Sequence, residues 1–274
     1  VFAFRRRPVF VLKMKDCREE WYDKDAKVAV TIVDVTSAAQ ELARGHLAGP
    51  TSTYFLTEAL ASVALLGSEM SEKDETVILQ MKCKGPLGGV NVECTSEGTL
   101  RGYAEKKILD EFDGMGKPDA RKVIGEAQYQ VTRSVPGRIL SQGISTSIDG
   151  YLAGSLQRKA CIRTEIAVSD EVEILEARGI MIEDMPDAKG ELKCCHVTDP
   201  NSISVASRNI LKQLGLENAE LRKTTPLKFA CRCSPDRALA MLAALSEAER
   251  AALPPTIDIT CHMCGKTFTV KTKE

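Results

Sequence analysis

The stretch that decides the fold is residues 77–104, which read VILQMKCKGPLGGVNVECTSEGTLRGYA. Apolar and polar residues alternate in 77–83, 89–94 and 99–104, which is the pattern of strands that bury one face. The two connections, 85–88 and 96–98, contain the glycine and proline that are typical of tight turns. This segment therefore predicts three consecutive antiparallel strands.

Helices and further strands flank this segment on both sides. Upstream, a short helix that Ser37 would cap precedes a longer helix from about Thr51 to Ser68. Downstream, strands are predicted at 128–135 and 139–145, a helix at 147–159, and strands at 162–169 and 172–185. Because strands and helices occur in runs without regular βαβ alternation, the predicted fold class is α+β. We expect residues 1–186 to form one N-terminal domain of antiparallel sheet and helices.

Residues 187–225 have a more polar composition and are predicted to be a helical linker. A helix from Ser202 to Gly215 would carry one apolar stripe, formed by Ile203, Ile210, Leu211 and Leu214. A helix of this length is marginal in water on its own, so it needs another surface to lie against. It is either an ordinary connector or an element that detaches easily.

Two close pairs of cysteines occur in the last part of the chain, in Cys231-Arg232-Cys233 and Cys261-His262-Met263-Cys264. Four thiolates in two pairs are the ligand set of a tetrahedral Zn²⁺ site. A site of four cysteines has no open coordination position, so it would be structural rather than hydrolytic. The same sulfurs can also form two disulfides, so the residues alone leave open a static zinc clip or a redox switch.

The segment 226–274 around these cysteines has clear local signals. Ser234-Pro235 is typical of a helix start, and Ser246 with Glu249 matches a capping box. Strands are predicted at 257–259 and around Phe268 and Val270. Few of these residues are large and apolar, so we expect this small C-terminal domain to depend on its metal for folding.

The composition excludes several classes of function. The 274 residues contain 37 Lys and Arg against 38 Asp and Glu, for a formal net charge of −1. This balance gives no electrostatic signal for nucleic acid or an anionic membrane, and no apolar run reaches the ~18 residues of a membrane span. Two alternatives are a zinc-ribbon module that binds nucleic acid or protein, and a thiol oxidoreductase that uses Cys261 and Cys264. The near-neutral tail disfavours the first, and the absence of a predicted βαβ context disfavours the second.

Cysteine usage bears on the compartment. The chain has 10 cysteines, and without a clear secretory signal they indicate a reducing environment, so we expect a cytoplasmic protein. The opening VFAFRRRPVFVLKMK is apolar and basic like an organellar presequence, which makes an organelle the alternative. Cys194-Cys195-His196 in the linker is a candidate second redox point or metal-ligand set.

With these residues assembled, the chain resembles the 33 kDa heat-shock protein family of redox-regulated holdase chaperones. The resemblance is clearest in 229–237, FACRCSPDR, and 261–268, CHMCGKTF. Residues 85–89 and 98–104 resemble the signature of the family's first domain, and 179–186 resembles the end of that domain. The linker is shorter and less charged than in bacterial relatives.

The resemblance implies a mechanism as well as a fold. Cys231, Cys233, Cys261 and Cys264 would hold one Zn²⁺ per chain in a reduced, inactive state. Oxidation would join Cys231 to Cys233 and Cys261 to Cys264, expel the zinc and unfold the C-terminal domain. The chain would then bind unfolded client proteins without ATP, as a homodimer and without catalysing a reaction. The apolar stripe of the linker, Ile203, Ile210, Leu211 and Leu214, together with surfaces of the first domain, is the expected client site.

Overall fold

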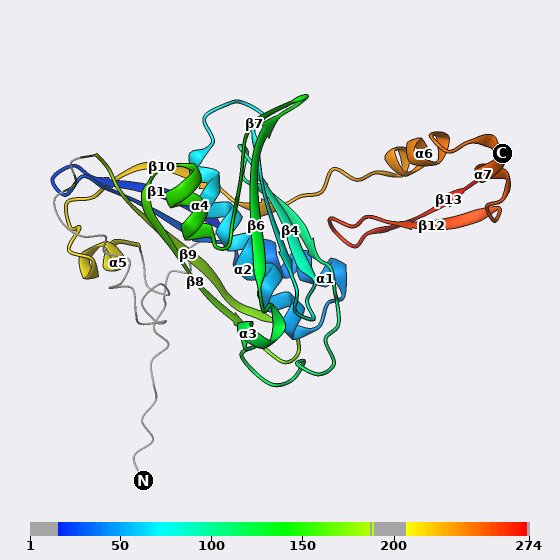
Figure 1. Cartoon of the computed structure of the whole chain (residues 1–274), viewed down its shortest axis with the longest axis horizontal. Coiled ribbons are helices and arrows are strands. Elements are labelled where there is room, and N and C mark those ends of the chain that lie inside the picture. Colours follow the sequence, from blue (N-terminus) through cyan, green and yellow to red (C-terminus); the bar gives the residue numbers. More distant parts are fainter. Residues whose placement is uncertain (1–15, 187, 189–206, 273–274) are drawn as a thin grey trace, which may run out of the picture.

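The computed structural model describes residues 16–186, 188 and 207–272, which form two large β-sheets, a C-terminal hairpin and several helices (Figure 1). The sheets have the strand orders β10-β1-β2-β9-β8 and β11-β5-β4-β3-β6-β7, and the hairpin is β12-β13. All neighbouring strands are antiparallel except β11 and β5. The α+β prediction is therefore confirmed.

The strands are β1 (Cys17–Asp23), β2 (Val28–Asp34), β3 (Thr76–Cys83), β4 (Gly89–Thr95), β5 (Thr99–Ala104), β6 (Ala127–Val135), β7 (Arg138–Ser145), β8 (Lys159–Val168), β9 (Ile174–Asp184), β10 (Glu220–Pro226), β11 (Lys228–Phe229), β12 (Thr256–Thr260) and β13 (Thr267–Lys271). The helices are α1 (Thr36–His46), α2 (Pro50–Leu66), η1 (Gly67–Glu69), α3 (Ala120–Val123), α4 (Ile148–Ser155), α5 (Ser207–Gln213), α6 (Pro235–Ala243) and α7 (Glu247–Ala251).

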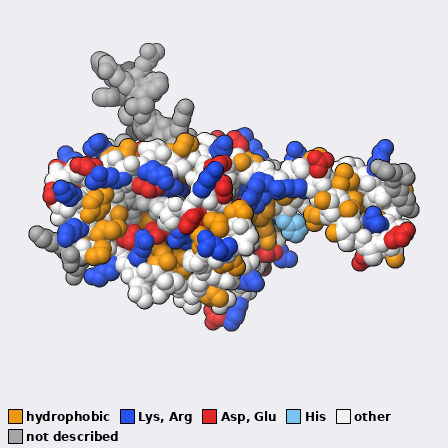
Figure 2. Space-filling view, turned by 90° about the horizontal axis from the view of Figure 1, so that it is seen from above, with side chains coloured by type: hydrophobic (Ala, Val, Ile, Leu, Met, Phe, Trp, Pro, Cys, Tyr) orange, Lys and Arg blue, Asp and Glu red, His pale blue; other side chains and the backbone are white. Residues whose placement is uncertain are grey.

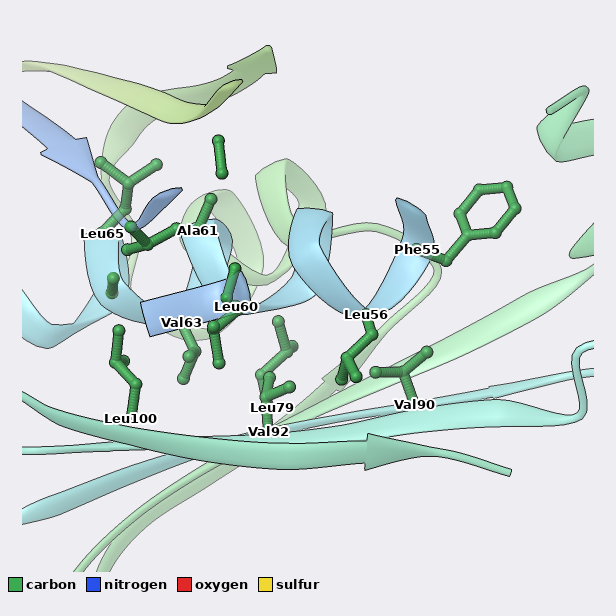
Figure 3. Packing of buried hydrophobic residues seen from close by; sticks show 14 of the residues in the cluster. Phe55, Leu56, Leu60, Ala61, Val63, Leu65, Leu79, Val90, Val92 and Leu100 are labelled. Atoms are coloured by element: carbon green, nitrogen blue, oxygen red, sulfur yellow. The ribbon is translucent and has the colours of Figure 1, made fainter. Parts of the chain in front are cut away.

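The three strands predicted from residues 77–104 are β3, β4 and β5, in the expected antiparallel order. Their apolar residues face α2, which packs between the two sheets and is buried along most of its length. Figure 3 shows Leu56, Leu60 and Val63 of this helix directed at the sheet residues Leu79 and Val92. Because both sheets cover α2, nearly all of its circumference is buried, in contrast to a helix that lies at the surface.

The start of α1 differs from the prediction. The helix begins at Thr36 after Val35, and Ser37 does not cap it. Instead, the carboxylate of Asp16 accepts hydrogen bonds from the backbone N–H groups of Ser37 (3.0 Å) and Ala38 (2.5 Å). A residue before β1 therefore supplies the acceptor for the unpaired N–H groups of the first helical turn.

The five-stranded sheet is buried on both faces. Its inner face joins the main core around α2, and its outer face forms a second core with α5. This outer apolar face, as it is called below, consists of Trp21, Val28, Val30, Ile32, Cys161, Ile180 and Ile182. Ile210, Leu211 and Leu214 of the α5 segment cover it and are at most 5 % exposed. The predicted apolar stripe thus has a partner surface.

Residues 220–225 lie in the segment expected to be a helical linker, but together with Pro226 they form β10 and extend the five-stranded sheet beyond β1. The next residues enter the other sheet, because Leu227 is buried in the main core and β11 pairs with β5. The chain between α5 and the first cysteine pair is therefore attached to both sheets.

The C-terminal unit of α6, α7, β12 and β13 projects from the two sheets, and its β12–β13 loop points back toward them (Figure 1). Ser234 caps α6, and Ser246 with Glu249 forms the predicted capping box of α7. The buried core of this unit consists of Ala238, Phe268 and Val270. A core this small gives little stability of its own.

Candidate metal and redox centre

The four cysteines of the two sequence pairs meet at one point. Cys231 and Cys233 directly follow β11, and Cys261 and Cys264 lie in the loop between β12 and β13. That loop is a tight knuckle in which the backbone N–H of Gly265 donates to the carbonyl of Cys261 (2.8 Å). Gly265 has a φ of 73°, a conformation that favours glycine. The four sulfur atoms all lie within 4.8 Å of one another.

This sulfur arrangement fits a tetrahedral metal ion. Zn–S bonds of about 2.3 Å in a tetrahedron place the ligand sulfurs about 3.8 Å apart. The Sγ atoms of Cys231 and Cys261 are 3.8 Å apart, and those of Cys233 and Cys264 are 3.4 Å apart. Among the described residues, this is the group of metal-binding side chains that the structure brings together. The four cysteines can therefore hold one metal ion.

A charge network connects the centre to the six-stranded sheet. Arg101 on β5 donates through Nη1 to the sulfur of Cys231 (3.7 Å) and through Nε to Glu93 of β4 (2.5 Å). Arg232, between the first two cysteines, donates to the same carboxylate (2.9 Å). Glu93 is 6 % exposed, so one buried carboxylate holds both arginines at the junction.

The cysteines differ in acidity because their surroundings differ. Burial disfavours the thiolate of Cys231, but hydrogen bonds from the backbone N–H of Cys233 and from Arg101 outweigh it and lower the pKa to about 7. Burial raises the pKa of Cys233 and of Cys264. Cys231 is therefore the thiol that ionises most readily among these three, and the thiolate is the form that reacts with oxidants and metals.

The knuckle also touches α1 and β5 through backbone contacts. The N–H of Gly102 donates to the carbonyl of Met263 (3.2 Å), and His46 hydrogen-bonds the carbonyl of Gly102 (2.8 Å). Gly45 approaches the knuckle so closely that a Cβ there would overlap the carbonyl oxygen of Cys264. The centre is thus docked on the two-sheet body.

No local sequence pattern singles out Gly45, His46, Glu93 or Arg101 for the site. Arg101 lies inside the 98–104 motif, but no local pattern shows that it reaches a cysteine 130 residues away along the chain. Of the remaining predicted site residues, Ile210, Leu211 and Leu214 lie together on the outer apolar face. Ile203 and the Cys194-Cys195-His196 cluster lie outside the described residues.

Comparisons with known proteins agree with this architecture. The family model described as Hsp33 protein matches residues 20–271. The 33 kDa chaperonin of Thermus thermophilus is 27 % identical over 89 % of this chain and 81 % of its own length. The 33 kDa chaperonin of Symbiobacterium thermophilum is 27 % identical over 87 % of this chain and 88 % of its own length. The crystal structure of the 33 kDa chaperonin (heat shock protein 33 homolog) of Thermotoga maritima superposes with a TM-score of 0.83, covering 94 % of this chain and 96 % of that one, at 20 % identity.

The family match places this chain, with its two sheets around a central helix and a docked unit of four cysteines able to hold a metal ion, in the class of chaperones. The match over most of its length is specific, and the chain belongs to the Hsp33 family. No helix within the described ranges has both the length and the apolar composition needed to cross a bilayer.

Proposed function

We propose that the protein is a redox-regulated, ATP-independent holdase that binds unfolded proteins after its zinc-bound cysteines are oxidised. It acts in the cytoplasm as a homodimer and catalyses no reaction. Each of three parts has its own role: residues 1–186 bind clients and form the dimer, residues 187–225 are the linker that covers the apolar face, and residues 226–274 respond to the oxidant. Cys231, Cys233, Cys261 and Cys264 are the ligands of one Zn²⁺, and the client surface includes Ile203, Ile210, Leu211 and Leu214.

The observation that carries this proposal is the continuous path from the cysteines to the outer apolar face. Cys231 follows β11 directly, β11 follows β10, and β10 follows the α5 segment that covers the face. Loosening the C-terminal unit removes the contacts of Arg101 and Gly102 with the cysteine centre. The segment between α5 and Cys231 is then no longer held at its C-terminal end by the cysteine centre.

The four cysteines can supply the switch chemistry. When bound, Zn²⁺ would keep all four sulfurs as thiolates and tie the two halves of the C-terminal unit together. Each disulfide forms when two cysteine thiolates give two electrons to one hydrogen peroxide, which takes two protons from the solvent and becomes two water molecules. Disulfide sulfurs no longer serve as thiolate ligands, so a unit with so small a core should unfold.

We assign the disulfides to Cys231–Cys233 and Cys261–Cys264. In the folded unit the sulfur contacts run between the pairs, from Cys231 to Cys261 and from Cys233 to Cys264. After unfolding, however, the two cysteines of each sequence pair stay within a few residues of each other, whereas 27 residues separate the two pairs, so sequence neighbours meet more often. Local pairing is therefore expected if bonds form as the unit opens, and peptide mapping of the oxidised protein distinguishes the two patterns.

Light scattering of a thermally unfolding client tests the function. Zinc-loaded, reduced protein should leave aggregation unchanged, whereas protein oxidised by peroxide at elevated temperature should suppress it and release one zinc per chain. Cys231→Ser should hold clients without oxidant, while the control Cys83→Ser should behave as wild type, because Cys83 lies outside the cluster. Equal suppression in both redox states would show a static metal clip instead of a switch.

The surface also bears on the alternative of a nucleic-acid-binding zinc module. Figure 2 shows Lys and Arg side chains interspersed with Asp and Glu over the visible face. This mixture lacks the single-sign patch that binding to phosphates requires. The charge distribution on this face therefore supports a protein-binding function over a nucleic-acid-binding one.

A further inference from the structure

Strand β10 is bound to its sheet mainly through its backbone. It lies at the end of the five-stranded sheet and pairs along β1, from Cys17 opposite Pro226 to Tyr22 opposite Glu220. All of its residues except Thr225 are exposed. Since its side chains bury little surface, the main-chain hydrogen bonds of the ladder provide most of its attachment.

The register shows which backbone groups make these bonds. The N–H of Leu227 donates to the carbonyl of Asp16 (3.0 Å), so these two residues form a hydrogen-bonded pair. Antiparallel ladders alternate between hydrogen-bonded and non-hydrogen-bonded pairs. The N–H of Thr225 therefore points toward β1 opposite Arg18, whereas the N–H of Thr224 points away. Pro226, which has no N–H, occupies a non-hydrogen-bonded position opposite Cys17.

The edge that β10 covers adjoins the outer apolar face. Trp21 belongs both to β1 and to that face, and Arg208 of α5 lies over its ring at 5.2 Å. The strand β10 follows α5 in the chain and contains the charged residues Glu220, Arg222 and Lys223. If α5 and β10 leave together, β1 exposes a free row of backbone donors and acceptors beside a large apolar surface.

We propose that β1 is the docking edge for an extended segment of unfolded client, and that β10 is the chain's own stand-in for that segment. The inference rests on the proposed holdase function and specifies where and how the client binds. Strand addition requires no particular side chains, because backbone groups supply the hydrogen bonds. It therefore suits a protein that must accept many unfolded sequences, while the adjacent apolar face favours segments with apolar residues.

Peptide competition tests the backbone part of the proposal. A peptide of residues 219–227 should displace a fluorescent unfolded client from the oxidised full-length protein. N-methylation at Thr225 removes the donor that faces β1 and should weaken competition at least tenfold. N-methylation at Thr224, the same residue type with its N–H on the far side, should leave competition unchanged. Equal competition by the two methylated peptides, or none by the parent peptide, overturns the proposal.

A disulfide lock tests the edge in the whole protein. Non-hydrogen-bonded pairs bring Cα atoms to about 4.5 Å, which a disulfide can span, so Pro226→Cys should join β10 to Cys17. The lock is placed in a Cys261→Ser/Cys264→Ser background, in which the metal centre cannot form. Client holding should be lost when the lock is closed and should return with dithiothreitol.

The control adds Cys17→Ser, which prevents the lock and keeps every other cysteine of that background. This control also accounts for any effect of dithiothreitol on other disulfides, because Cys161 is disulfide-bonded. If locked and unlocked proteins both hold client, β1 is not the docking edge and the holdase function stands. If the metal-free background holds no client even when unlocked, the proposed function itself fails.

Discussion

Replacing Leu211 by alanine should activate the protein without any oxidant. Leu211 is 2 % exposed and packs on the outer apolar face through α5. Truncating a buried leucine to alanine costs about 2–5 kcal/mol, and the cost applies to the docked state because the side chain is solvated once α5 detaches. Even 2 kcal/mol raises the ratio of detached to docked molecules by about 30-fold. The short α5 cannot compensate by its own helical stability.

The assay is client light scattering with reduced, zinc-loaded protein, together with binding of a dye specific for exposed apolar surface. Leu211→Ala should suppress aggregation and bind more dye, with its zinc content unchanged, because Ile203, Ile210 and Leu214 of the proposed client surface remain in place of the one residue lost. Asn209→Ala is the matched control, because Asn209 is an exposed residue of the same helix. If the two variants behave alike, or if Leu211→Ala becomes active only after it loses zinc, the docking of Leu211 does not hold the protein inactive.

Three further changes test the contacts around the centre and the main core. Gly45→Ala should push the knuckle off α1 and speed zinc release under peroxide, measured with a chromogenic chelator, whereas Gly154→Ala should not, because a Cβ there meets nothing within 4 Å. Arg101→Gln should raise the pKa of Cys231, which burial raises but hydrogen bonds lower to about 7, because one hydrogen bond to the thiolate is lost. The pH dependence of Cys231 alkylation in metal-free protein measures this change, and an unchanged midpoint would contradict it. Burial raises the pKa of the Glu58 carboxyl above its usual 4.5, so the folded protein favours the protonated side chain. The stability that this protonated side chain contributes at low pH is lost as pH rises through the folded-state pKa. Glu58→Gln should therefore raise the melting temperature at pH 7 but not at pH 4, and equal effects at both pH values would disprove this origin.

Much of this structure could be predicted from local patterns. The alternation in 77–104 predicts β3 to β5, the cysteine spacing predicts the metal ligands as a group, and the Ser234 and Ser246 caps mark α6 and α7. These features depend on neighbouring residues, through side-chain periodicity and backbone hydrogen bonding. Strands β1 and β2 were not among the predicted elements, although β2 is almost entirely buried.

Local sequence patterns determined strands β3 to β9 of the first domain, the caps of α6 and α7 and the grouping of the four cysteines, because each follows from spacing along the chain. Only the tertiary structure decided that the polar segment 220–226 is a strand, since the open edge of β1, and not its own periodicity, holds it extended. The same is true of the contacts that Arg101 and Gly45 make with the cysteine centre. Such contacts depend on distances between segments far apart in the chain, which folding sets through the packing of whole sheets and which no local periodicity encodes.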